Sequence, residues 1–190
     1  MKRILPLTIL LIAIFSATTF AQFEIGASYE LRDEDPENGF GLRIQKGIFE
    51  SLPIVNLGLR LHASYFSEEN SISENNFSYS QDLTHYDIGF AAIGGISLGL
   101  LEPYVGLGLG TENYERAIQD VQNDPNNLAP ESGDESSLYW NMLAGAKVTI
   151  IPMLRPFVEY RYSVTELEKP ELDDVNSQTG RIMFGVSISF

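Results

Sequence analysis

The sequence contains no cysteine and only two histidines, and basic residues are few, 12 against 26 acidic ones. The absence of cysteine excludes a disulfide framework, a thiolate metal site and a thiol nucleophile. The formal net charge of −14 at pH 7 argues against nucleic acid as a partner. No motif predicts a cofactor or a metal site, so the chemistry of this chain must be sought in how its polar and apolar residues alternate.

Only the N-terminus carries a long apolar run. Lys2 and Arg3 precede the apolar residues 4–15, and Thr19-Phe20-Ala21 is an acceptable cleavage site. The run is too short and wrongly flanked for a spanning helix, so the pattern predicts a secretory signal peptide over residues 1–21. Its removal brings the formal charge from −14 to about −16. We expect one mature domain over residues 22–190, which leaves the cytoplasm and crosses any membrane with strands.

The last ten residues, Arg181 to Phe190, form an alternating segment. Successive side chains of a strand point to opposite faces, which places Ile182, Phe184, Val186, Ile188 and Phe190 on one face. The other face is small or polar. A soluble chain rarely ends on an aromatic residue in register with its apolar face, because termini fray into water. The closing strand of a transmembrane barrel has to pair with the first strand, which favours this ending.

Seven earlier segments alternate in the same way. The eight predicted strands cover about 23–32, 40–48, 54–66, 85–92, 104–110, 138–148, 157–164 and 181–190. The long polar segments 33–39, 67–82, 112–137 and 166–178 alternate with short turns between these strands. Outer-membrane barrels have an even number of strands, short turns at one end and long loops at the other. The predicted fold class is therefore all-β, an eight-stranded antiparallel up-and-down transmembrane β-barrel.

A soluble barrel such as a lipocalin, with its apolar residues inside, is the competing interpretation. The polar face of the strands does not suit a soluble surface, because it mixes glycine with isolated charges. Aromatic residues on the apolar face lie near the long-loop ends of the strands, where a membrane interface would hold them. These interface aromatics are Tyr29, Phe40, Tyr65, Tyr86, Trp140 and Tyr162. Both features favour a barrel whose apolar side chains face lipid.

The interior of such a barrel is just wide enough to be filled by side chains. We call the face of a strand on which a residue lies, set by the alternation, its strand parity. Strand parity predicts an interior ionic network of Glu24, Glu30, Arg32, Arg43, Arg60, Asp87, Lys147, Glu159, Arg161 and Arg181. Buried charges must pair, and Glu159 and Arg161 beside Arg181 predict a Glu–Arg cluster. The network is either a plug that rigidifies the barrel or a gated ion path, and we favour the plug.

Three motifs together carry a family resemblance: residues 103–110 (PYVGLGLG), residues 157–162 (FVEYRY) and the C-terminal phenylalanine. With the signal peptide and the eight segments, the mature chain resembles the small OmpA/OmpX-like outer-membrane β-barrel family. The resemblance implies a Gram-negative outer membrane and an assembly signal in the final strand. The barrel-assembly machinery would recognise that signal through Gly185, Ile188 and Phe190. No peptidoglycan-binding domain follows the barrel, so a cell-wall tether is not implied.

The remaining motifs are weak. Residues 106–110 (GLGLG) lack the spacing of a phosphate-binding loop. Residues 120–131 share ligand positions with a calcium loop, but Pro125 stands where that loop needs glycine. Most acidic residues fall in the four long segments and give that end a negative field. These segments could bind divalent cations weakly beside anionic lipid head groups, or form a solvated, repulsive surface, which is the simpler interpretation.

Three classes of function fit the sequence. We favour a monomeric structural or interaction barrel, whose partners are outer-membrane lipid and lipopolysaccharide. A narrow or gated pore is the alternative. An outer-membrane enzyme such as a lipid A deacylase or a protease is disfavoured, because a deacylase needs a Ser/His/acid set facing lipid near the rim. His62 and His85, the only histidines, both have inward parity.

Overall fold

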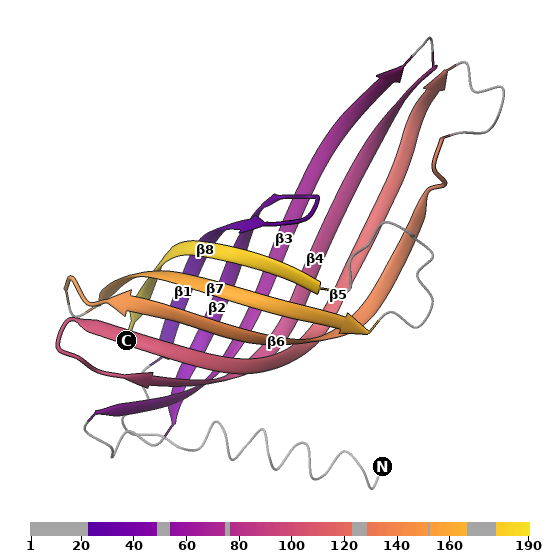
Figure 1. Ribbon diagram of the computed structural model, residues 1–190. Helices are drawn as coiled ribbons and strands as arrows, with labels where there is room; N and C mark the ends of the chain where they lie inside the picture. Colours follow the sequence, from indigo (N-terminus) through magenta and orange to yellow (C-terminus); the bar gives the residue numbers. More distant parts are fainter. Residues whose placement is uncertain (1–22, 49–53, 75–76, 123–128, 152, 167–177) are drawn as a thin grey trace, which may run out of the picture.

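The chain closes into a barrel of eight antiparallel strands, in which each strand pairs with its sequence neighbours and β1 pairs with β8 (Figure 1). The computed structural model describes residues 23–48, 54–74, 77–122, 129–151, 153–166 and 178–190. The strands are β1 (Phe23–Arg32), β2 (Asn38–Ile48), β3 (Val55–Glu74), β4 (Phe77–Ile96), β5 (Leu101–Gln122), β6 (Gly133–Val148), β7 (Leu154–Glu166) and β8 (Gln178–Ser189). The predicted strand number and up-and-down order are confirmed.

The final strand closes the barrel. β8 pairs with β1 in continuous register from Glu24–Ser189 to Arg32–Arg181. The backbone amide of Phe190 then donates a hydrogen bond of 2.8 Å to the carbonyl of Phe23. This closure satisfies backbone groups that hydrocarbon could not.

The side chains are arranged inside out. Outward aliphatic residues are exposed, with Leu42 at 65% and Leu107 at 63% of their full accessible area. Inward charged residues are buried, with Arg60 at 0% and Arg181 at 2%. The lipocalin-like alternative requires the opposite arrangement and is therefore wrong. The interior also holds a small buried apolar cluster, formed by Ala91, Ile93, Tyr104 and Leu143.

Two of the predicted loops are largely strand. Residues 67–82 continue β3 and β4, and most of residues 112–137 belong to β5 and β6. The hairpin is in register far beyond the predicted boundary, for example at the pair Glu69–Asp82. Apolar residues such as Ile72 and Ile118 are isolated among polar ones in these segments, so they lack the regular apolar alternation by which a strand is recognised in a sequence.

The extra length of β3, β4, β5 and the start of β6 forms a sheet that projects from one end of the barrel, which we call the projecting sheet (Figure 1). β2 pairs with β3 only as far as Gly39–Phe66. On the other side, the register of β5 with β6 ends at Arg116–Gly133. Within the described residues, the upper part of β3 is therefore an edge strand.

Two sequence predictions lie outside the described residues, namely the signal peptide over residues 1–21 and nearly all of the fourth long segment, 166–178. Among the residues that are described, no helix has the length and apolar character needed to cross a bilayer.

Candidate functional site

Charged side chains from opposite walls of the barrel meet in its interior. At the short-turn end, Glu24 accepts hydrogen bonds of 3.0 Å from Arg43 Nη2 and from Lys147 Nζ. Lys147 Nζ also lies 3.0 Å from Glu102 Oε1. The Arg43 guanidinium stacks on Phe157, 3.3 Å from the ring centroid. Each buried charge at this level has a partner of opposite sign.

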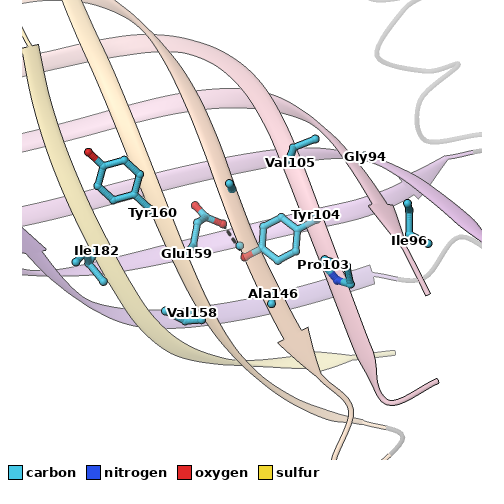
Figure 2. A pocket seen from close by; sticks show the side chains of 12 residues that line it. Gly94, Ile96, Pro103, Tyr104, Val105, Ala146, Val158, Glu159, Tyr160 and Ile182 are labelled. Carbon is cyan, nitrogen blue, oxygen red and sulfur yellow. Dashed lines mark hydrogen bonds between the residues drawn. The ribbon is translucent and has the colours of Figure 1, made fainter. Parts of the chain in front are cut away.

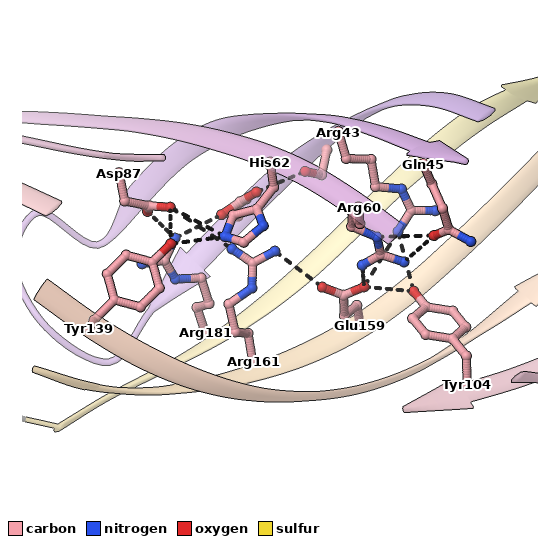
Figure 3. A network of polar contacts seen from close by, with 12 residues as sticks. Arg43, Gln45, Arg60, His62, Asp87, Tyr104, Tyr139, Glu159, Arg161 and Arg181 are labelled. Carbon is pink, nitrogen blue, oxygen red and sulfur yellow. Dashed lines mark hydrogen bonds and ion pairs between the residues drawn. The ribbon is translucent and has the colours of Figure 1, made fainter. Parts of the chain in front are cut away.

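Glu159 is the centre of the middle level (Figure 3). Its Oε2 accepts hydrogen bonds from Arg60 Nη1, from the Tyr104 hydroxyl at 2.8 Å and from Arg43 Nη1 at 3.4 Å. Its Oε1 accepts a hydrogen bond of 3.3 Å from Arg161 Nη2. A buried carboxylate without partners would cost several kcal/mol, and these four donors offset that penalty.

Asp87 is the centre of the next level towards the projecting sheet (Figure 3). Arg181 Nη1 donates to its Oδ2 at 2.6 Å, and the Tyr139 hydroxyl donates to its Oδ1 at 3.2 Å. His62 Nε2 lies 2.9 Å from the same tyrosine hydroxyl. Arg181 Nη1 also donates to Glu30 Oε2 at 3.3 Å. One guanidinium thus joins carboxylates from two strands.

Arg161 on β7 and Arg181 on β8 are divided between these two levels. Arg161 and Arg181 stand directly opposite each other in register, where like charges repel. Arg161 pairs with Glu159 on its own strand, whereas Arg181 pairs with Asp87 across the barrel. Arg161 Nη1, 4.0 Å from Asp87 Oδ1, links the levels. Strand parity identifies the wall on which a side chain lies but not its partner across the barrel.

Glycines in the inner wall leave space for these long side chains. A Cβ atom on Gly41 would lie 1.8 Å from Glu30 Oε1. A Cβ atom on Gly89 would lie 2.3 Å from the Tyr139 hydroxyl and 2.6 Å from His62 Nε2. The mixture of glycine and charge in the sequence therefore has a packing cause.

The interior becomes aromatic where the projecting sheet begins. Arg32 Nη2 donates to the Tyr114 hydroxyl at 3.2 Å, and the Arg32 guanidinium lies 5.1 Å from the centroid of Phe66. His85 packs against Tyr114 with ring centroids 4.9 Å apart, and its Nε2 lies 3.3 Å from Glu112 Oε2. These side chains fill the barrel at its long-loop end.

Several members of the network were not among the residues predicted from the sequence. Tyr104 and Tyr139 donate to the two central carboxylates, and Gln45 accepts two hydrogen bonds from Arg60. Their strand parity places them all on the inner face, so this signal could have identified them. A search restricted to charged residues overlooks the neutral donors and acceptors that complete a buried network.

The six predicted interface aromatics all lie on the outer wall. Four of them are cross-strand neighbours, because Phe40 is in register with both Tyr29 and Tyr65, and Tyr65 with Tyr86. The Tyr29 hydroxyl donates to Asn38 at 2.6 Å, towards the long-loop end. We call the set the girdle: Tyr29, Phe40, Tyr65, Tyr86, Trp140 and Tyr162. Its place at a membrane interface remains a prediction.

The three predicted assembly residues lie along β8 and just after it. Ile188 and Phe190 are exposed on the outer wall. Gly185 has inward parity, and a Cβ atom there would lie 2.3 Å from Phe157 Cζ. Recognition of these residues by the assembly machinery remains a prediction.

No group of three or more histidine, aspartate or glutamate side chains within the described ranges is placed to hold a metal ion. The calcium-like segment 120–131 begins at the end of β5, and its residues 123–128 lie outside the described chain.

Comparisons with known proteins agree with this architecture. No family profile and no curated protein sequence matches the chain. Among solved structures, a major outer membrane protein from Thermus thermophilus is similar with a TM-score of 0.67 and 13% identity, over 90% of this chain and all of the other. The structure of Neisserial surface protein A is similar with a TM-score of 0.57 and 18% identity, over 90% of this chain and 97% of that chain.

A third similar structure is that of Ail of Yersinia pestis in complex with the heparin analogue sucrose octasulfate. It matches with a TM-score of 0.54 and 16% identity, over 90% of this chain and 100% of that chain. At these identities the likeness concerns the fold, which is that of the small eight-stranded outer-membrane β-barrels.

Proposed function

We propose that this chain is a small outer-membrane β-barrel with a structural and interaction role. In this proposal the interior is a plug, and the projecting sheet with its acidic residues is the contact surface. The observation that supports it best is the network centred on Glu159 and Asp87, which crosses the barrel and ties opposite walls together. A cross-section filled by ion pairs suits a rigid support better than a conduit.

The outer wall supports the membrane location. Its exposed aliphatic residues form a band between the girdle and the short turns, as lipid would require. The fold of the similar structures is found in outer membranes. Secretion by the predicted signal peptide would bring the chain there.

The projecting sheet carries like charges in register just beyond the girdle. Glu69 faces Asp82, and Glu115 faces Asp134, all with the same outward parity as the girdle residues. Carboxylates directly opposite each other destabilise a sheet. A divalent cation shared with the phosphates of lipopolysaccharide would offset this repulsion. We therefore propose this face as the surface that contacts anionic lipid head groups. The sucrose octasulfate bound by Ail is a polyanion, which these carboxylates would repel without a bridging cation.

A narrow pore is the second candidate, and one observation favours it. Asn141 and Ser163 are buried and in register on β6 and β7. The Asn141 amide and the Ser163 hydroxyl make no hydrogen bond within the described part of the chain. Buried polar groups of this kind usually bind ordered water. Hydrated groups beside the ion pairs would favour a path for small solutes.

Planar-bilayer recordings separate the two candidates. The plug predicts no steady conductance from the purified full-length mature protein. Steady, reproducible single channels would overturn the plug and establish the pore. Replacing Arg60 and Glu159 together by glycine is the positive control, since it removes the centre of the network and should produce conductance.

We do not propose an enzymatic activity. His62 and His85 are both buried inside the barrel, where they contact Tyr139 and Glu112. A general base must reach the proton that it abstracts, and neither ring faces the lipid side where a lipid A deacylase would act.

The contact surface is tested in vesicles that contain lipopolysaccharide. Mg²⁺ should raise the unfolding temperature of the wild type above its value in EDTA. The variant Glu69→Gln with Glu115→Gln should lose most of this gain. The control variant Asp35→Asn with Glu37→Gln removes the same charge from exposed positions outside the projecting sheet and should keep it. An equal gain in both variants would favour a solvated, repulsive surface instead.

A further inference from the structure

The outer wall has a depression of about 690 Å³, whose lining extends from Gly94 and Ile96 on β4 to Ile182 on β8 and has its smallest side chains on β6 (Figure 2). We call it the β6 trough. Its floor is formed by Ala144, Gly145 and Ala146, and its two sides are raised by Val105 and Tyr160. Pro103, Val158 and Ile182 complete the sides. The lining atoms are almost wholly apolar.

The trough follows from the register of small residues. Ala144 lies between Val105 on β5 and Tyr160 on β7, and Ala146 lies between Pro103 and Val158. Each methyl group is therefore flanked by larger outward side chains. Met142 and Val148 restore full-sized side chains beyond either end of the floor. The small-residue floor is thus local to one segment of β6, while Gly94, in register with Val105, extends the depression onto β4.

The floor is one backbone thick. Gly145 has inward parity and no side chain, and a Cβ atom there would lie 2.6 Å from the Tyr104 hydroxyl. That hydroxyl donates to Glu159 at 2.8 Å, so the ionic network begins directly beneath the floor. The Tyr104 hydroxyl and the Glu159 carboxylate point inward, so the Tyr160 hydroxyl is the polar side-chain group that the described lining presents on the outer wall.

We propose that the β6 trough holds one acyl chain of an outer-membrane lipid in a fixed position. The inference rests on the outer-membrane location proposed above. The trough lies in the aliphatic band of the outer wall, where hydrocarbon chains are the surrounding medium. A flexible linear chain can follow a narrow floor and gain dispersion contacts on three sides, whereas a flat wall offers one. The wall of a second copy is convex, so it would bridge the raised sides rather than reach the alanines.

The experiment uses a phospholipid with a photoreactive diazirine in its acyl chain, in vesicles that hold the full-length mature protein. After irradiation, adducts are mapped by peptide mass spectrometry. Residues around the trough should be labelled several-fold more than outward residues of β1 to β3. Ala144→Leu with Ala146→Leu fills the trough and should lower this labelling to the level of the other strands. The control, Ala27→Leu with Ala63→Leu, adds the same groups to exposed outward alanines on β1 and β3 and should leave the enrichment unchanged.

The possible results separate the trough from the membrane location. Labelling spread evenly over the outward residues, or enrichment that survives in the filled variant, would overturn the trough and leave the location standing. Val105 and Tyr160 left unlabelled, while the other outward residues are labelled, would overturn the lipid in favour of a second copy that covers the trough. A chain that takes no label on any outward residue would overturn the membrane location, and this inference with it.

Discussion

Arg181 on β8 crosses the barrel to Asp87 on β4, the strand four places away in the ring of eight, and its Nη1 lies 2.6 Å from Asp87 Oδ2. Both side chains are buried. The pair therefore connects diametrically opposite walls, and the same guanidinium contacts Glu30 on β1. The stability of the barrel should depend on this pair as a unit.

Replacing one partner alone should be costly. Asp87→Asn leaves the Arg181 charge buried with less compensation, and we expect it to lower the free energy of unfolding by about 3–5 kcal/mol. The double variant Asp87→Leu with Arg181→Met removes both charges. It should lose less free energy of unfolding than the sum of the losses in Asp87→Leu alone and Arg181→Met alone. Urea titrations in lipid vesicles, followed by the fluorescence of the single tryptophan, Trp140, measure both. Strictly additive losses would contradict the coupling.

A charge on the outer wall tests the orientation of the barrel. Leu107→Arg should lower stability by about 2–4 kcal/mol if that residue faces the bilayer midplane. Glu115→Arg, on the same face of β5 but beyond the girdle, should cost no more than about 1 kcal/mol. Unfolding titrations in vesicles compare the two. A harmless Leu107→Arg would contradict the assignment of this face to lipid.

Removal of Phe190 should affect insertion more than stability. The residue is exposed and its backbone makes one hydrogen bond to Phe23, so its loss removes little folding energy once the barrel is formed. We expect lower outer-membrane levels in cells and a nearly unchanged unfolding midpoint for protein refolded in vitro. Phe190→Tyr keeps the aromatic ring and is the control. Normal membrane levels of the truncated chain would refute the assembly signal.

Two glycines of β4 should respond differently to a methyl group. Gly89→Ala brings a Cβ atom against the Tyr139 hydroxyl and His62, and should cost about 1–3 kcal/mol as overpacking. Gly94→Ala faces outward, where the nearest atom is Leu57 Cδ2 at 3.7 Å, and should be nearly neutral. Equal effects in unfolding titrations would show that the interior can rearrange around the added group.

The barrel and its two faces could be predicted from alternation alone. Each row of alternate apolar residues, such as the one from Ile182 to Phe190, identifies the face of its strand that contacts hydrocarbon. The residues of that one strand are enough to make this assignment. The length of β3 to β5 could not be predicted in this way. Beyond Phe66 apolar residues no longer recur at every second position, so the pairing of β3 with β4 and of β4 with β5 leaves no trace in the alternation.

The ion-pair partners across the barrel interior also could not be predicted from the sequence. The contact of Arg181 with Asp87 depends on how far each strand is shifted along its neighbour around the ring, because shear decides which inward residues reach the same level. Alternation carries no information on that shift. The neutral members of the network, such as Tyr104 and Tyr139, have an inward parity that is visible, but their roles follow from the carboxylates that they reach.

The upper part of β3 bears on whether copies of this protein associate with one another at high density. Beyond Phe66 the side of β3 that faces away from β4 pairs with no strand among the described residues, and such an unpaired margin can pair with a strand of another molecule and begin a fibril. Glu68 and Glu69 stand on this margin, one on each face. Two copies paired along it would bring the carboxylates of both molecules together. We expect the repulsion between these charges to oppose polymerisation where many copies share one membrane.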